Sequence, residues 1–334
     1  MAEGRLLRRL IGAGARTEDA EFRRVAEEVI IQEREKKHHL LANDLERLLY
    51  GEQSVGRNAR TPQLDVPMDR ERGLPLVDVR EPVRSLSDLI LSGETRVVLE
   101  SILREQNKDE ILRTYGLRPA GRLLFFGPPG CGKTTAADAL ATELGIPVAT
   151  IRLDAVVSSY LGETAANLRK VFDFVEAHRL VALFDEFDAL GKEREDPGEH
   201  GELRRVINAF LQLLDAYKGA SILIAATNHE GLLDGALWRR FDEVLLFERP
   251  SREQIAQLVS MKLRAIRADL PLERPDFLDQ FVGLSHADIE RVLVRAIKTM
   301  ILDGRKFLTE DLVAAAQERE RERRKVLRRK TGAA

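Results

Sequence analysis

The stretch Gly127-Pro128-Pro129-Gly130-Cys131-Gly132-Lys133-Thr134-Thr135, GPPGCGKTT in one-letter code, decides the fold of this chain. It matches the pattern G-x-x-x-x-G-K-[ST], in which glycines let backbone N–H groups surround an anion. The apolar run Leu123–Phe126 precedes the loop, and the helix-favouring run Thr135–Leu144 follows it. The N-terminus of such a helix places partial positive charge behind the loop. The sequence therefore predicts that all residues of the loop contact a bound nucleotide.

Two carboxylates follow a second apolar strand and extend this prediction to a reaction. Lys133 is expected to reach the β- and γ-phosphates, and the hydroxyl of Thr134 is expected to bind Mg²⁺. Asp185 and Glu186 come directly after the apolar run Val181–Phe184. Asp185 would hold Mg²⁺ through water, and Glu186 would polarise an attacking water. A glutamate beside the magnesium aspartate favours water over a hydroxyl acceptor, so we expect hydrolysis of the bound nucleotide with Mg²⁺ as cofactor.

Two later polar elements are candidates for the same reaction. Asn228 ends the next apolar run, where it could orient the water or contact the γ-phosphate; a turn-forming asparagine is the second interpretation. Arg239 and Arg240 could stabilise charge on the transferring phosphoryl group, often from a neighbouring subunit, although isolated arginines are usually surface charge.

The order of apolar runs predicts an α/β fold with a parallel sheet. The expected strands are Leu123–Phe126, Val148–Ile151, Val181–Phe184, Ile222–Ala226 and Val244–Phe247. Helices are expected between them at Thr135–Leu144, Ala165–Ala177 and Glu202–Tyr217, which argues for a sheet covered on both faces. No strand is expected after Pro250, where helices are predicted at Arg252–Ala268, Asp276–Gln280, His286–Leu302 and Thr309–Arg324.

These patterns divide the chain into five parts. We expect an N-terminal helical region (1–50), with helices within Thr17–Tyr50, and a linker (51–77). A large α/β domain (78–250) and a small helical lid domain (251–317) would follow, and the chain would end in a basic tail (318–334). The tail is interpreted as a solvated helix end that frays.

The composition limits the class of protein. The chain has 334 residues, of which 44% are hydrophobic and 32% charged, with a formal net charge of −2. No apolar run has the length of a membrane span, and the charge argues against a broad nucleic-acid surface. We therefore expect a cytoplasmic protein without membrane contact. Cys131 is the only cysteine, so there is no intramolecular disulfide; its thiol is either reactive within the loop or buried and inert.

From about Asp78 to Ala316 the chain resembles the AAA family proper of the AAA+ ATPases. The likeness rests on the phosphate loop, on FDEFDAL, and on HGELRRVINAFLQLLD at His200–Asp215. It continues with AATN, LDGALWRRFD at Leu233–Asp242 and GLSHADIERV at Gly283–Val292. The resemblance implies a five-stranded P-loop domain with a helical lid, in an ATP-driven ring that is usually a hexamer. It also implies that Asn228 is the sensor-1 residue and that Arg239 and Arg240 are arginine fingers. His286 and Ala287 would lie near the nucleotide.

The resemblance further implies a substrate path. Tyr160, Leu161 and Gly162 match an aromatic–hydrophobic–glycine loop that projects into the central pore, with Lys192–Glu199 as a second pore loop. Without the resemblance, Tyr160 would be read as a half-buried loop tyrosine. The chain departs from the family where Arg239 and Arg240 are adjacent, where His286 replaces glycine, and where Gly235 replaces proline.

The expected function is therefore remodelling, unfolding or threading of proteins through a pore, driven by ATP hydrolysis. The N-terminal helices would recruit a protein substrate or adaptor. One alternative is a regulator or unfoldase that works with a separately encoded protease or other partner; no His-Glu-x-x-His motif marks a built-in zinc protease. The sequence also leaves open a nucleic-acid-handling ATPase and a switch in which ATP only controls assembly.

Overall fold

The computed structural model describes residues 25–26, 28–30, 32, 64–69, 72–157, 161–187, 200–228 and 238–331. The predicted N-terminal helices fall almost wholly outside these residues, although the described positions between 25 and 32 are helical. Within the described residues, no helix has the length and apolar character needed to cross a bilayer.

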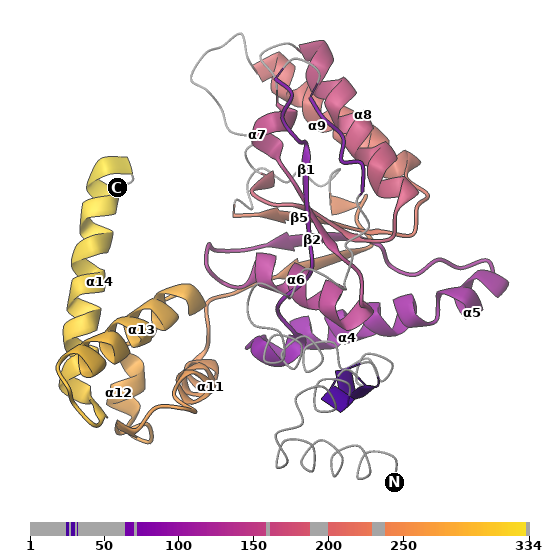
Figure 1. Ribbon diagram of the computed structural model, residues 1–334. Coiled ribbons are helices and arrows are strands. Elements are labelled where there is room, and N and C mark those ends of the chain that lie inside the picture. The colour runs from indigo at the N-terminus through magenta and orange to yellow at the C-terminus, as the bar shows by residue number, and fades with distance from the viewer. Residues whose placement is uncertain are drawn as a thin grey trace.

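A six-stranded sheet forms the centre of the structure (Figure 1). Its strands, in sheet order, are β1 (Val77–Arg80), β3 (Val148–Ile151), β4 (Val181–Phe184), β5 (Ile222–Thr227), β2 (Arg122–Phe126) and β6 (Glu243–Leu246). β3, β4, β5, β2 and β6 run parallel, which confirms the five predicted strands. β1 pairs antiparallel with β3 at the edge and was not predicted from the sequence. Its sequence Val77-Asp78-Val79-Arg80 alternates apolar and charged residues and lacks the continuous apolar run that marks strands such as β4.

The side chains of the inner strands alternate between two hydrophobic clusters, because successive strand residues point to opposite faces. Phe184 of β4 packs with helices α7 (Leu153–Val156), α8 (Leu161–Ala177) and α9 (His200–Ala216). Leu183 packs on the other face with the 3-10 helix η1 (Leu86–Asp88), α4 (Gly93–Asn107) and α6 (Lys133–Leu144). Helix α5 (Asp109–Thr114) continues from α4 (Figure 1). The sheet is therefore covered on both faces.

A separate hydrophobic cluster lies among the C-terminal helices. It joins α11 (Arg252–Lys262), α12 (Pro275–Asp279), α13 (His286–Leu302) and α14 (Glu310–Thr331). The prediction that no strand follows Pro250 is wrong, since β7 (Ala268–Asp269) pairs in parallel with β8 (Leu308–Thr309). The predicted helix over Arg252–Ala268 accordingly ends early, at Lys262. The chain beyond it extends so that the carbonyl of Arg267 accepts a hydrogen bond from the N–H of Leu308.

The C-terminal basic segment is helical as far as Thr331 and is not wholly solvated. Glu320 is only 3% exposed in its side chain and pairs with Arg291 at 2.7 Å and with Arg323 at 2.9 Å. Arg324 forms a further ion pair with Asp288, near the start of α13. The prediction of a solvated helix end therefore fails for this turn of the helix, because Glu320 of α14 pairs with Arg291 of α13 and Arg324 of α14 pairs with Asp288 of α13.

Candidate nucleotide site

The glycine-rich loop connects β2 to α6, and two of its glycines are required by their surroundings. Gly127 has a φ of 131°, and a Cβ there would lie 2.3 Å from the carbonyl oxygen of Phe247. Gly130 has a φ of 75°, and a Cβ there would lie 2.8 Å from the hydroxyl of Ser285. Any side chain would therefore push the loop away from β6 or from the start of α13. The conformation that exposes the loop N–H groups depends on glycine at both positions.

Lys133 begins α6 with its side chain under the loop, where it is only 6% exposed. Its Nζ donates to the carbonyl oxygens of Gly127 at 2.6 Å and Pro128 at 3.0 Å, and to Oδ1 of Asn228 at 2.8 Å. Because β2 and β5 are neighbours in the sheet, the ends of both strands meet at this ammonium group. The structure thus brings Lys133 and Asn228 together.

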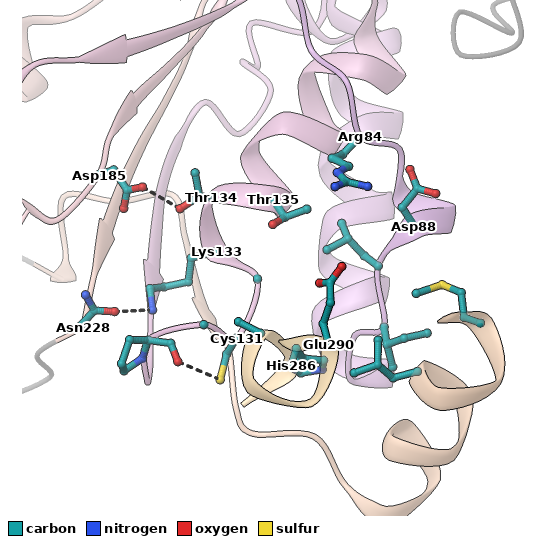
Figure 2. A pocket seen from close by; sticks show the side chains of 18 of the residues that line it. Arg84, Asp88, Cys131, Lys133, Thr134, Thr135, Asp185, Asn228, His286 and Glu290 are labelled. Atoms are coloured by element: carbon teal, nitrogen blue, oxygen red, sulfur yellow. Dashed lines mark hydrogen bonds between the residues drawn. The ribbon is translucent and has the colours of Figure 1, made fainter. Parts of the chain in front are cut away.

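Thr134 and Asp185 meet across the same edge of the sheet. The hydroxyl of Thr134 donates to Oδ2 of Asp185 at 2.6 Å (Figure 2). A hydroxyl and a carboxylate are the oxygen donors that Mg²⁺ prefers, and protein sites for this ion usually add substrate phosphates and water to one or two such groups. Among the described residues, no group of three or more His, Cys, Asp or Glu could hold a metal by itself. The pair therefore suits a magnesium ion bound together with a nucleotide.

Glu186 stands in a strained backbone conformation between two anchored phenylalanines. Its φ is 50°, the only positive value among the described residues other than glycine. Its N–H donates to Oδ1 of Asp185 at 2.9 Å, which helps to hold this turn. On either side, the rings of Phe184 and Phe187 lie 5.1 and 4.7 Å from that of Phe210. This packing compensates for a backbone cost of about 1–2 kcal/mol and leaves the Glu186 side chain exposed.

A cavity of about 350 Å³ lies beside these groups, between the loop and the C-terminal helices. Figure 2 shows Lys133, Asp185 and Asn228 on the strand side, and Cys131, His286 and Glu290 toward α13. Sequence reasoning missed several residues that line the cavity: Arg84, Asp88, Leu89, Ile90, Leu258, Met261, Lys262 and Glu290. They come from η1, the segments that flank it, α11 and α13. Glu290 lies within the motif Gly283–Val292 but was not singled out, and no motif or periodicity marked the others, because their proximity depends on how the helices pack.

One of these missed segments is held by a buried carboxylate on the loop helix. Asp138 of α6 is 4% exposed and accepts from Nη1 of Arg80 at 2.6 Å. It also accepts from the backbone N–H groups of Val83 at 3.0 Å and Arg84 at 2.9 Å. Asp138 therefore holds the backbone at Val83 and Arg84, and Arg84 lines one side of the cavity.

The start of α13 forms the opposite wall. Ser285 caps this helix through the N–H of Asp288, and the N–H of Ala287 donates to the carbonyl oxygen of Gly130 at 3.0 Å. His286 and Ala287 therefore border the cavity, and their contact with a nucleotide stays a prediction. Burial lowers the pKa of His286, and a weaker interaction with the backbone of Ile90 acts in the opposite direction.

Cys131 lies on the loop at 3% exposure. Burial raises the pKa of its thiol, although Lys133 and Arg249 act against this. The thiol is therefore mainly protonated at neutral pH, as a buried and inert cysteine would be.

The two arginines lie outside the cavity wall and differ in their surroundings. Arg240 forms an ion pair with Asp215 and donates to the carbonyl oxygen of Leu211 at 3.3 Å. Arg239 is exposed, and no partner for its side chain is found among the described residues. Trp238 packs edge-on against Phe126 with ring centroids 5.1 Å apart. Trp238 and Arg240, the residues on either side of Arg239, are therefore each held by a contact within the domain.

The predicted pore loop is described only in part. Tyr160 and Lys192–Glu199 lie outside the described residues. Leu161 and Gly162 form the first backbone turn of α8. The aromatic position therefore directly precedes a helix of the sheet domain.

Comparison with known proteins agrees with this geometry. Residues 123–249 match the model of the ATPase family associated with various cellular activities (AAA). The chain is 41% identical over 97% of both chains to the uncharacterized AAA family ATPase y4kL of Sinorhizobium fredii. It is 35% identical to the proteasome-activating nucleotidase of Saccharolobus islandicus, covering 66% of this chain and 58% of that protein.

Two further similarities are more partial. The chain is 32% identical to the ATP-dependent zinc metalloprotease FtsH 3 of Sphaerobacter thermophilus, covering 73% of this chain and only 51% of that protein. The crystal structure of the FIGL-1 AAA domain matches the fold with a TM-score of 0.57 at 23% identity, over 76% of this chain and 92% of that one. By its full-length similarity to an AAA family ATPase and by the matched family model, this chain belongs to the AAA family of ATPases.

Proposed function

We propose that this chain hydrolyses ATP in the cavity between the glycine-rich loop and α13. The observation that carries the proposal is the convergence of Lys133, Thr134, Asp185 and Asn228 at the ends of three neighbouring strands, with Glu186 beside them. Ligands of open α/β sheets bind at these carboxyl ends. Family membership implies ATP hydrolysis, and this geometry supplies residues for each part of the reaction.

The loop N–H groups and Lys133 bind the phosphates, for which Lys133 exchanges its present carbonyl acceptors. Thr134 and Asp185 would hold Mg²⁺, which when bound neutralises charge on the phosphate oxygens. Glu186 accepts a proton from the attacking water, since its carboxylate is exposed beside Asp185. The side-chain amide of Asn228 binds Lys133 and would also lie near the attacking water. The backbone conformation at Glu186 sets the direction in which its side chain leaves the main chain.

Two substitutions separate binding from hydrolysis. We expect Glu186→Gln to keep ATP affinity within a few-fold and to lower kcat by about 10²–10⁴-fold, because only proton transfer is lost. Lys133→Ala should instead weaken ATP binding, because a phosphate contact is removed. Calorimetric titration and steady-state phosphate release measure both quantities, and Glu248→Gln, an exposed change outside the cavity wall, is the matched control. A Glu186→Gln variant with wild-type turnover would contradict the assignment.

We further propose that hydrolysis drives remodelling of protein substrates by a ring, expected to be a hexamer, with Tyr160 on its pore. The names of two relatives support this proposal, because one activates a proteasome and the other is an ATP-dependent protease. A separately encoded protease is therefore one candidate partner class. The position of Tyr160, directly before α8, is compatible with a loop that moves with the ATPase domain.

The test of remodelling uses a fluorescent protein with an unstructured tail as the substrate. Loss of its fluorescence reports unfolding, and phosphate release reports ATP turnover. We expect Tyr160→Ala to stop unfolding and to leave ATPase activity within a few-fold. Tyr115→Ala, at a tyrosine that is 78% exposed on another surface, should change neither. Undiminished unfolding by Tyr160→Ala would exclude threading past this residue.

A further inference from the structure

The cavity has two chemically different ends. At one end the loop, Lys133, Thr134 and Asp185 supply donors and charge for phosphates. At the other end Ile90, Leu258, Met261 and Ala287 supply an apolar wall, and His286 lies among them. Hydrolysis of ATP in this cavity, on which this inference rests, would place the triphosphate at the first end and adenine at the second.

His286 is held in place by its backbone and not by its side chain. It is the first residue of α13, directly after the capping Ser285 and directly before Ala287, whose N–H binds the loop carbonyl of Gly130. Both ring nitrogens are buried, and neither forms a hydrogen bond with any described residue. Leaving a buried polar group unpaired is unfavourable, so a ligand that offers the ring a hydrogen bond would be stabilised. Turning the ring gives up only its weak interaction with the backbone of Ile90.

A second polar side chain of α13 lines the cavity and holds an ion pair with α11. Glu290 lies one helical turn after His286 on the same face of α13, and its Oε1 accepts from Nζ of Lys262 at 2.5 Å. The side chains of Ile90, Leu258, Met261 and Ala287 offer no strong acceptor. An imidazole kept neutral by burial has one acceptor nitrogen and one N–H.

We propose that His286 recognises the base: its ring turns toward the cavity and accepts a hydrogen bond from the 6-amino group of adenine. That amino group is the only hydrogen-bond donor on the polar edge of adenine. Buried N–H groups are left without a hydrogen-bond partner more rarely than buried acceptors. A protein acceptor is therefore expected for the 6-amino group more than a donor is for the ring nitrogens of the base. His286 is thus a specificity-determining residue for the nucleotide.

The test compares ADP with the diphosphate of purine riboside, which lacks the 6-amino group, and with inorganic tripolyphosphate. Calorimetry on the full chain should show that the wild type binds ADP about 3–10-fold more tightly than the purine riboside diphosphate, as one hydrogen bond predicts. In His286→Ala this ratio should fall to about one, while the affinity for tripolyphosphate stays unchanged. His286→Asn, whose side-chain oxygen also accepts, should restore part of the ratio.

The outcomes separate the two proposals. An unchanged ratio in His286→Ala overturns base recognition by His286 but leaves ATP hydrolysis in place. A wild type that binds neither ADP nor tripolyphosphate contradicts the proposed nucleotide site itself. Equal losses for ADP and tripolyphosphate in His286→Ala, with a lower melting temperature, would assign His286 a structural role and also overturn the inference.

Discussion

At the scale of single residues, the two adjacent arginines have different surroundings. The Arg240 side chain is 35% exposed and bound to Asp215 of its own subunit, whereas Arg239 is exposed to solvent. A group that acts on a neighbouring subunit has to be free to reach it. The ion pair of Arg240 therefore suits a residue that orients its neighbour, and the exposure of Arg239 suits the finger itself.

We predict that Arg239→Ala lowers kcat by at least about 10²-fold with ATP affinity unchanged, because charge on the transferring phosphoryl group is no longer stabilised. Arg240→Ala should lower kcat less and reduce stability by up to about 1 kcal/mol, the usual value of a partly exposed ion pair. Steady-state kinetics and thermal melting of both variants provide the comparison.

Mixing Arg239→Ala with Lys133→Ala protein should restore part of the activity, because some interfaces then combine an intact site with an intact arginine. A larger kcat loss for Arg240→Ala than for Arg239→Ala would reverse the assignment. Absence of any recovery after confirmed subunit exchange would argue against a finger that acts between subunits.

The loop thiol gives a second prediction at this scale. Because burial raises the pKa of Cys131, less thiolate is present at pH 7 than in an exposed cysteine. We expect maleimide labelling of the native protein to be at least about 10-fold slower than labelling of the urea-unfolded chain, and to become faster as the pH rises. Mass spectrometry over time measures both rates. Rapid stoichiometric labelling of the native protein at pH 7 would show that the thiol is accessible and reactive.

At the scale of elements, α14 is attached to α13 by charges as well as by apolar packing. Burial would raise the pKa of Asp288, but the hydroxyl of Ser285 and the guanidinium groups of Arg324 and Arg291 outweigh it and leave the pKa lowered. Asp288 is also part of the capping box at the start of α13. The last helix therefore contacts the end of α13 that faces the nucleotide cavity.

We predict that Glu320→Gln destabilises the protein by about 1–2 kcal/mol, because this 3% exposed carboxylate accepts from both Arg291 and Arg323. The matched change Glu318→Gln should cost less than about 0.5 kcal/mol, since Glu318 is 57% exposed and pairs with Arg321 at the longer distance of 3.5 Å. Urea unfolding of both variants measures the difference. Equal stabilities would show that the buried carboxylate contributes no more than a surface ion pair.

The sequence predicted the elements that have a local cause. The five parallel strands are apolar runs bounded by turn residues, and the predicted helix His286–Leu302 has the bounds found in α13. The loop residues and the Asp185–Glu186 pair follow from fixed spacing. By contrast, β1, the β7–β8 pair and the cavity residues from η1 and α11 depend on contacts between distant segments. The burial of Glu320 likewise depends on where α14 packs, which no local pattern expresses.

At the scale of the whole molecule, the sheet with its covering helices and the group α11–α14 have separate hydrophobic clusters. They meet at the cavity, where Ala287 binds Gly130 and Ile90 packs against the C-terminal cluster. A nucleotide in this cavity would contact both parts, with its phosphates on the loop and its base against α11 and α13.

The Ala287–Gly130 contact has a consequence for how the protein melts. This backbone hydrogen bond and the contact at Ile90 form a narrow junction between the sheet domain and the C-terminal helices. Such a junction couples their unfolding weakly, so differential scanning calorimetry of the protein alone should resolve two heat-absorption peaks. ADP bridges the junction and should merge the peaks, with a gain of about 2.7 kcal/mol at 100 times its Kd. Gly130→Ala, whose Cβ would lie 2.8 Å from the Ser285 hydroxyl, should keep the peaks apart even with ADP. If ADP raised the melting temperature of one peak and left the other unchanged, the nucleotide would be bound by only one of the two parts. The unfolding of the sheet domain and that of the C-terminal helices would then not be coupled through the loop.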